Sequence, residues 1–262
     1  MASFSVVNNI ASMNAQANLS VSNLGLQKAL TRLSSGLRIN NSGDDAAGLA
    51  VANGYRADVA ALGQGIRNAN DGLSTLQIVD GALNNISTLL DRLATLASQS
   101  ASSNFTGSRT VLSAEFTAVL GEIDREAGVA GLNAVTNFSV FVGTGNLTGT
   151  INAADSTALA INASTIDSAA NAATALTAVK AAVGTLGGVQ GSVGTLENTM
   201  QYAISLAQTQ VVNIKAAESR IRDANVAEES ANMTRFNILT QSGVAALAQA
   251  NQSTSAVLNL LR

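Results

Sequence analysis

The stretch "LSTLQIVDGALNNISTLLDRLATLA", residues 73–97, decides the fold of this chain. Its apolar side chains recur at alternating spacings of three and four residues: Leu76, Val79, Leu83, Ile86, Leu90, Leu93 and Ala97. A repeat sustained over three heptads predicts a long helix that packs along a narrow line against other helices.

Two further stretches carry the same spacing. The shorter one predicts a second helix, and its apolar positions are Leu112, Phe116, Val119 and Ile123. The longer one predicts a third helix, marked by Leu196, Met200, Ala203, Ala207, Ile214, Ala217 and Ile221. We therefore expect a mainly α fold, a long coiled-coil-like helical bundle.

The composition supports long helices and excludes much chemistry. The 262 residues include no Pro, which would break a helix interior, and no His, Cys or Trp. Without His and Cys, most nucleophile–base pairs, transition-metal sites and disulfides are excluded. The net charge of −3 is too weak to suggest a nucleic-acid partner. We expect no enzyme activity, no cofactor and no metal.

The N-terminal sequence does not resemble a Sec-type secretory signal. The first twenty residues, "MASFSVVNNIASMNAQANLS", contain no early basic cluster and no apolar run of about 7 residues, as a secretory signal requires. No uninterrupted apolar stretch approaches the about 18 residues of a membrane span. We expect neither Sec export nor insertion into a membrane.

The middle of the chain has a different texture. In "FSVFVGTGNLTGTI", residues 138–151, apolar and polar residues alternate on both sides of a Gly-rich turn, which predicts a β-hairpin near 138–152. Residues 152–190 are rich in Ala, Ser, Thr and Gly. For them we expect loops, with one short helix over 168–183.

Both ends of the chain carry narrow apolar stripes on otherwise polar helices. The N-terminal stripe contains Leu19, Leu26, Leu30, Leu33 and Leu37, and the C-terminal stripe contains Met233, Phe236, Val244, Leu247, Leu258 and Leu261. Isolated helices of this kind are marginal in water. We expect the two terminal helices to pair, and we expect further copies of the chain to complete their burial. All of these residues except Leu19 are our candidate subunit-assembly residues.

Asp44 and Asp45 are adjacent carboxylates in a chain poor in charge. Paired acids can form a catalytic dyad, but a dyad needs a cleft and a further polar partner. Asp is also favoured at helix N-termini, where its carboxylate accepts hydrogen bonds from free N–H groups. The two acids precede "AAGLAVA", so we interpret them as helix caps. The preceding segment "LRINNS", between Gly36 and Gly43, is predicted to be a connector.

Two long segments resemble the terminal signatures of bacterial flagellins. Residues 30–86, "LTRLSSGLRINNSGDDAAGLAVANGYRADVAALGQGIRNANDGLSTLQIVDGALNNI", strongly resemble the N-terminal signature. Residues 223–252, "DANVAEESANMTRFNILTQSGVAALAQANQ", look like the C-terminal one. The likeness covers about the first 130 and the last 75 residues. The middle is short, so the resemblance is to a flagellin that lacks the outer variable domains.

The resemblance implies a structural subunit that polymerises into the flagellar filament for motility, outside the cell. Residues 1–40 and 223–262 would form a terminal helical pair that lines the inner core of the filament. Residues 41–222 would form a helical bundle domain with the β-hairpin. The implied partners are further copies of the chain, the type III export apparatus, a flagellin chaperone, and the filament cap and junction proteins.

Some flagellins are recognised by a Toll-like receptor. The family's contact motif resembles "LLDRLATLASQS", residues 89–100, with Arg92 and Leu96 at matching positions and Glu115 at the matching acid of the next helix. Thr95 departs from the family's usual Glu. Arg92, Leu96 and Glu115 are therefore candidate receptor contacts, and the alternative is that Leu96 only packs.

Other functions fit the sequence less well. A hook–filament junction protein shares similar terminal helices, but we expect it to diverge from the signature at 30–86. A secreted enzyme with flagellin-like ends would need a longer middle segment with catalytic residues. A coiled-coil adhesin would not explain two separate signatures at opposite ends.

Overall fold

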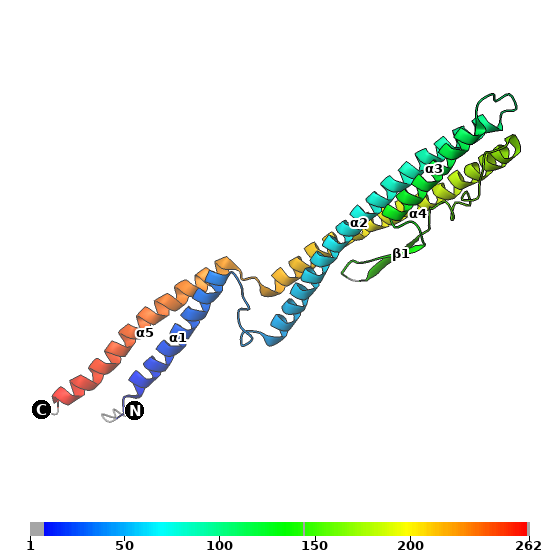
Figure 1. Ribbon diagram of the computed structural model, residues 1–262. Coiled ribbons are helices and arrows are strands. Elements are labelled where there is room, and N and C mark those ends of the chain that lie inside the picture. Colours follow the sequence, from blue (N-terminus) through cyan, green and yellow to red (C-terminus); the bar gives the residue numbers. More distant parts are fainter. Residues whose placement is uncertain (1–7, 144, 261–262) are drawn as a thin grey trace. The chain divides into compact units, whose positions relative to one another are not determined.

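The computed structural model describes residues 8–143 and 145–260, with side chains described as far as residue 252 (Figure 1). The chain divides into two compact units. Unit 1 comprises Met1–Ala57 and Asn213–Arg262, and unit 2 comprises Asp58–Val212. Both ends of the chain therefore belong to the same unit. The family resemblance implies a different division, with residues 1–40 and 223–262 in the filament core and residues 41–222 in the next domain. That division stays a prediction.

The described residues form helices and one small sheet. In chain order these are α1 (Ile10–Ser35), α2 (Ala46–Ala101), α3 (Arg109–Val129), β1 (Thr136–Phe141), β2 (Asn146–Ile151), α4 (Ala169–Arg222) and α5 (Val226–Leu260). Helices α2 and α4 contribute residues to both units. The mainly α fold with one β-hairpin and paired terminal helices is confirmed.

The core of unit 2 lies where α2, α3 and α4 pack side by side (Figure 1). All seven apolar residues of the heptad repeat at 73–97 are buried, and none is more than 6% exposed. Helix α3 contributes Phe116 and Ile123, and α4 contributes Val179, Val193 and Met200. The spacing of three and four residues therefore located the core of the bundle correctly.

Strands β1 and β2 form an antiparallel two-stranded sheet, in which Thr136 pairs with Ile151 and Phe141 pairs with Asn146. The Val142 N–H donates a hydrogen bond to the Gly145 carbonyl at 2.9 Å, which closes the turn. The hairpin lies on α2, where it approaches a glycine very closely. A Cβ on Gly65 would lie 2.5 Å from the backbone of Val142 and Gly143.

Helix α4 corrects one expectation. We expected a short helix at 168–183 followed by loop, but α4 continues without a break to Arg222. Leu186 and Val189 lie in the buried core of this stretch, so packing outweighs the poor helix propensity of its glycines. The glycines of this stretch face away from the core, because a Cβ at Gly187, or at Gly191, would meet nothing within 4 Å.

The segment between β2 and α4 is irregular, as expected, but it is part of the core. Leu159, Ile161 and Ile166 are buried in it. The Asp124 carboxylate of α3 accepts hydrogen bonds from the backbone N–H and the hydroxyl of Ser156, at 2.8 and 3.0 Å. This segment is therefore packed into the core, although its sequence is of low complexity.

Helix α4 also contains an apolar window. Within the described residues, it contains a window of 18 residues with a mean hydropathy of 1.3, which by length and composition could cross a membrane. Our expectation from sequence did not allow for this window. The inward side of α4 lies in the core of unit 2, and core helices of water-soluble proteins pass the same test.

In unit 1, α1 and α5 lie side by side (Figure 1). Asn9 contacts Ala250 and Gly25 contacts Phe236, so the pair is antiparallel. The Asn9 side chain accepts a hydrogen bond from the Ser12 N–H at 3.0 Å and caps the start of α1. Gly36 ends α1 with a φ of 72°, a conformation that glycine adopts without strain.

Candidate assembly site: the paired terminal helices

The line along which α1 and α5 face one another is called the seam here. Small residues on one helix receive large side chains from the other. The Phe236 ring lies over Gly25, where a Cβ would come within 2.5 Å of it, and Leu19 lies over Gly243. At the far end, the Asn9 side-chain amide donates a hydrogen bond to the Ala250 carbonyl at 2.9 Å.

The structure separates the candidate assembly residues into several groups. The half-buried members, which lie toward the seam, are Leu26, Leu33, Met233, Phe236 and Leu247. Leu30 and Val244 are 47% and 58% exposed. Leu37 is half-buried but lies beyond the end of α1. Leu258 and Leu261 lie outside the residues whose side chains are described. The role of all these residues in assembly stays a prediction.

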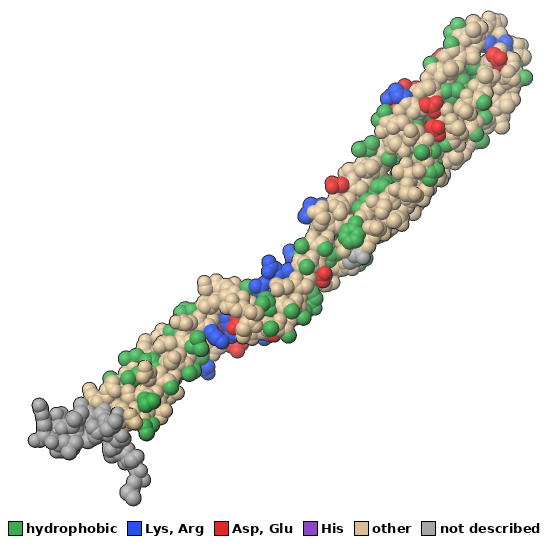
Figure 2. All heavy atoms as spheres, turned by 60° about the horizontal axis from the view of Figure 1, so that its bottom comes forward, with side chains coloured by type: hydrophobic (Ala, Val, Ile, Leu, Met, Phe, Trp, Pro, Cys, Tyr) green, Lys and Arg blue, Asp and Glu red, His purple; other side chains and the backbone are tan. Residues whose placement is uncertain are grey.

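Very little of unit 1's helical pair is fully buried. Among the described residues, Ala29 is the one fully buried apolar side chain of α1, and α5 contributes only Glu229 to the buried set. Large apolar side chains stand exposed instead: Ile10, Met13, Val21, Leu24 and Leu30 on α1, and Val226, Ile238, Leu239 and Val244 on α5. Figure 2 shows hydrophobic side chains scattered over this part of the surface.

Several of these outward residues do not belong to the stripe expected from the sequence. Of that stripe, Leu19, Leu26 and Leu33 lie toward the seam. Ile10, Met13, Val21 and Leu24 were not named. The signal that could have found them is a second apolar stripe, because these residues and Ala17 follow one another at spacings of 3, 4, 4 and 3.

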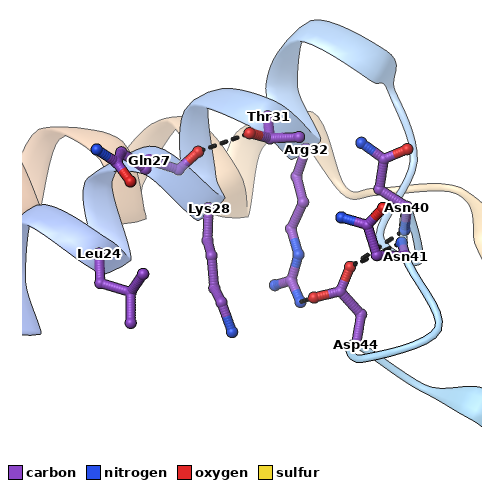
Figure 3. A pocket seen from close by; sticks show the side chains of 8 residues that line it. All are labelled: Leu24, Gln27, Lys28, Thr31, Arg32, Asn40, Asn41 and Asp44. Atoms are coloured by element: carbon purple, nitrogen blue, oxygen red, sulfur yellow. Dashed lines mark hydrogen bonds and ion pairs between the residues drawn. The ribbon is translucent and has the colours of Figure 1, made fainter.

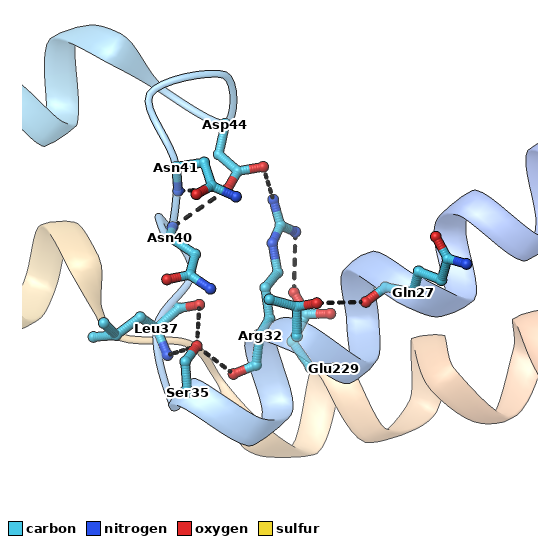
Figure 4. Close-up of polar contacts among 9 residues, drawn as sticks. Gln27, Arg32, Ser35, Leu37, Asn40, Asn41, Asp44 and Glu229 are labelled. Carbon is cyan, nitrogen blue, oxygen red and sulfur yellow. Dashed lines mark hydrogen bonds and ion pairs between the residues drawn. The ribbon is translucent and has the colours of Figure 1, made fainter.

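Arg32 organises the polar end of the helical pair (Figure 4). One terminal nitrogen lies 3.2 Å from the Glu229 carboxylate, and the other lies 3.9 Å from that of Asp44. Glu229 is only 8% exposed, so its charge depends on Arg32 for compensation. Arg32 therefore connects α1, the start of α5 and the connector that leads to α2.

Asp44 holds the connector in a tight loop. Its carboxylate accepts hydrogen bonds from the backbone N–H groups of Asn40 and Asn41, at 3.3 and 3.2 Å. The hydrogen bonds from Asn41 and Asn40 lower the pKa of the Asp44 carboxyl, and the positive charges of Arg32 and Lys28 lower it further, against the opposing effect of burial. The carboxylate is therefore charged at neutral pH.

The two adjacent acids, predicted to be helix caps, have different partners. Asp45 immediately precedes α2, and its carboxylate accepts a hydrogen bond from the Gly48 N–H at 2.9 Å. That is the geometry of an N-cap. The hydrogen bonds of Asp44 instead run back to the connector, because the backbone turns at 41–44 before the helix starts. The contribution of either acid to stability stays a prediction.

The connector is also tied to the junction between α4 and α5 by backbone hydrogen bonds. The Arg38 N–H donates to the Arg222 carbonyl at 2.7 Å, and the Ala224 N–H donates to the Gly36 carbonyl at 2.9 Å. Leu37 and Asp223 form an isolated antiparallel bridge between them. The predicted connector thus pairs with the far end of the chain.

A shallow hollow opens beside α1 and the connector (Figure 3). Leu24, Lys28 and Arg32 line its helical side, and Asn40, Asn41 and Asp44 line the other. Its volume of about 520 Å³ includes open solvent. Lys28 forms no ion pair with any described residue.

The candidate receptor residues lie in unit 2. The Arg92 guanidinium donates to the Glu115 carboxylate, with Nε at 2.9 Å from Oε1, so α2 and α3 are joined by an ion pair. Leu96 is 1% exposed and belongs to the core. The Leu96 side chain therefore packs and is not available to a partner while unit 2 is folded.

The described residues of unit 1 carry exposed apolar surface. Among them, no group of three or more His, Cys, Asp or Glu side chains is arranged to hold a metal ion. Unit 1 is distinguished by the helical pair of α1 and α5, which come from opposite ends of the chain. Few side chains of this pair are fully buried, and several large apolar ones are exposed. These features define a class of mainly helical structural proteins that expose apolar surface on their paired terminal helices.

Comparison with known proteins identifies the family. Residues 6–139 match the bacterial flagellin N-terminal helical region, and residues 166–261 match the bacterial flagellin C-terminal helical region. The chain belongs to the bacterial flagellin family. It is a structural subunit of the flagellar filament, and no finding favours a junction protein.

Several relatives match over different lengths. A flagellin of Halalkalibacterium halodurans is 37% identical over 97% of this chain and 98% of its own length. The flagellar filament 33 kDa core protein of Treponema phagedenis is 34% identical over the same shares. A Salmonella typhimurium flagellin is 43% identical over 61% of this chain but only 32% of its own length. A crystal structure of Bacillus cereus flagellin aligns with a TM-score of 0.48 and 24% identity, over 58% of this chain and 94% of that one.

Proposed function

We propose that this flagellin assembles through its terminal helical pair, formed by residues 1–40 and 223–262, and that residues 41–222 form the next domain of the subunit. The observation that carries the proposal is the thin burial of the pair. Five large apolar side chains of α1 and four of α5 are exposed. Because full burial of one such side chain contributes about 1.5–3 kcal/mol, neighbouring copies offer a large gain.

The same observation explains why the chain would form a polymer instead of a closed dimer. The exposed apolar side chains of α1 and those of α5 belong to two different helices, so they form two different surfaces of the pair. Contacts between unlike faces are head-to-tail, and they extend into a helical filament when the rotation does not close. The filament would lie outside the cell, in keeping with the family.

The remaining partners follow from the family resemblance and stay predictions. They are the type III export apparatus, a flagellin chaperone, and the filament cap and junction proteins. Recognition by a Toll-like receptor also stays a prediction, and it would have to use Arg92 and Glu115 without the buried Leu96 side chain.

Seeded elongation tests the proposal. Purified full-length chain is added to short filament fragments, beside a truncated chain of residues 41–222, and growth is followed by electron microscopy and sedimentation. Circular dichroism of the truncated chain checks that it stays helical. We expect only the full-length chain to elongate the seeds. Elongation by a helical truncated chain would show that the terminal pair is not the assembly element.

A further inference from the structure

The methionines of the chain lie in very different surroundings. The sequence has four, of which Met1 lies outside the described residues. Met13 on α1 is 64% exposed, Met233 on α5 is half-buried toward the seam, and Met200 on α4 is fully buried. Met200 is also tightly packed, since its terminal methyl group lies 3.2 Å from the place that a Cβ on Gly72 would take. Among the three described methionines, Met13 is therefore the one that stands open to solvent.

An exposed thioether reacts with hydrogen peroxide without any further reactant. The sulfur attacks one peroxide oxygen, the O–O bond breaks and an S=O bond forms. The other oxygen takes up the proton of the first and leaves as water. The sulfur is oxidised by two electrons and the peroxide is reduced by two, so the product is methionine sulfoxide.

The composition of the chain directs mild oxidation to methionine. The sequence contains no Cys and no Trp. A reactive Cys thiolate would otherwise compete for the same peroxide. Because Met200 is buried and Met233 is half-buried, the reaction is directed further, to the exposed sulfur of Met13.

The place of Met13 on α1 gives the reaction a consequence. Its neighbours along the outward apolar stripe are Ile10 and Ala17, whose side chains offer no hydrogen-bond donor. A sulfoxide is polar, and its oxygen is a hydrogen-bond acceptor. Burying such a group without a partner is unfavourable. A subunit with oxidised Met13 therefore gains less from burying the stripe than an unmodified one.

We propose that Met13 is a reversible oxidation site, at which a hydroperoxide converts the thioether to the sulfoxide and so holds the subunit back from assembly. The inference rests on the proposed function and adds a chemical modification that regulates it. A thiol-dependent reductase reverses the step: two thiols become a disulfide, the sulfoxide oxygen leaves as water, and the apolar side chain is restored.

Mass spectrometry tests the selectivity. Purified full-length chain is exposed to dilute hydrogen peroxide for increasing times and digested with trypsin. The sulfoxide at each methionine is then quantified from fragment ions, which separate Met13 from Met1. We expect Met13 to be oxidised roughly tenfold faster than Met200, with Met233 between them. Equal rates at Met13 and Met200, in a chain that circular dichroism shows to stay helical, would overturn the inference.

Seeded elongation tests the consequence. For each chain, the rate of elongation of untreated seeds after peroxide is divided by the rate before it. This ratio should fall to about one tenth for the wild-type chain, because the sulfoxide is buried without a partner. Methionine sulfoxide reductases for both epimers should restore it. The ratio should stay unchanged for Met13→Leu, and it should fall as in the wild type for the control Met233→Leu.

Two results would overturn the inference and leave the proposed function standing. One is normal elongation by wild-type chain in which Met13 is oxidised. The other is an equal fall of the ratio in Met13→Leu, since another group would then carry the effect of peroxide. Both are read against untreated wild-type chain that elongates its seeds. If that chain elongates no seed, the proposed function and the effect of the sulfoxide are both wrong.

Discussion

Gly25 and Phe236 face one another across the α1–α5 seam so closely that a Cβ on Gly25 would lie 2.5 Å from the ring. The ring belongs to a half-buried side chain, and the guanidinium of Arg235 lies 5.0 Å from its centroid. Because the ring is the far end of a flexible side chain, it can swing aside for a methyl group but not for a larger one. Gly25 therefore sets the distance between the two helices.

The first prediction concerns this contact. Gly25→Leu should destabilise the helical pair by about 1–3 kcal/mol, because it forces the ring out of the seam. Thermal depolymerisation of filaments, followed by light scattering, measures the loss. Gly25→Leu/Phe236→Ala should recover most of it. The control is Gly54→Ala, where a Cβ meets nothing within 4 Å. Equal losses with and without the Phe236 change would contradict the account.

Gly65 differs from Gly25 in what it meets. Its nearest neighbours are backbone atoms of Val142 and Gly143, at 2.5 Å from an added Cβ, and a backbone cannot swing aside. The second prediction is that Gly65→Ala lifts the hairpin from α2 at a cost of about 1–3 kcal/mol. Amide hydrogen exchange should speed up at Phe138 and Gly149, which pair with one another across the hairpin. Gly81→Ala on the same helix meets nothing within 4 Å and should be neutral or stabilising. Unchanged protection of the hairpin would contradict this prediction.

The bundle was predictable because its signal is periodic. Leu76 and Leu90 stand in a heptad repeat, and their burial follows from this spacing alone. The Gly-rich stretch around Gly187 was not predictable in that way. Intrinsic propensity disfavours a helix there, and the buried side chains of Leu186 and Val189 outweigh it only once α2 and α3 are in place.

The candidate site was predictable only in part, for a geometric reason. Helix α1 carries two apolar stripes, one through Leu19 and Leu26 and one through Val21 and Leu24. The sequence does not say which stripe meets α5. The choice depends on where α5 offers space, and Gly243 under Leu19 provides it. Pairs such as Arg32 and Glu229, which are far apart in sequence, have no periodic signal at all.

The third prediction concerns pH. The pKa of Asp44 is lowered from its ordinary value of 3.8, chiefly by hydrogen bonds from Asn41 and Asn40. A carboxyl group whose pKa is lowered by folding stabilises the folded chain above its ordinary pKa, and this contribution is lost as the pH falls through the lowered pKa. Asp44→Asn should therefore destabilise the connector at pH 7, by about 1–3 kcal/mol for hydrogen bonds to a charged group.

Hydrogen exchange at the Asn40 and Asn41 amides, measured between pH 7 and pH 2.5, checks this prediction after correction for the intrinsic exchange rate. The difference in protection between wild type and Asp44→Asn should shrink as the pH falls below 3.8. Asp167→Asn is a suitable control, because Asp167 also has a lowered pKa but lies in unit 2. A difference that stays constant over this range would show that the charge of Asp44 does not hold the loop.

The last prediction concerns Arg32 and Glu229, whose side chains are 30% and 10% exposed. Arg32→Met should destabilise the helical pair by about 2 kcal/mol, between the small cost at exposed pairs and the larger cost at buried ones, because it leaves the Glu229 charge uncompensated. Arg32→Met/Glu229→Leu should cost less than Arg32→Met alone, since two apolar side chains pack where a lone charge would be buried. Thermal depolymerisation of the two single variants and the double variant gives the coupling between the residues. If the two single losses simply add, Arg32 and Glu229 act independently, and Arg32 does not compensate the Glu229 charge.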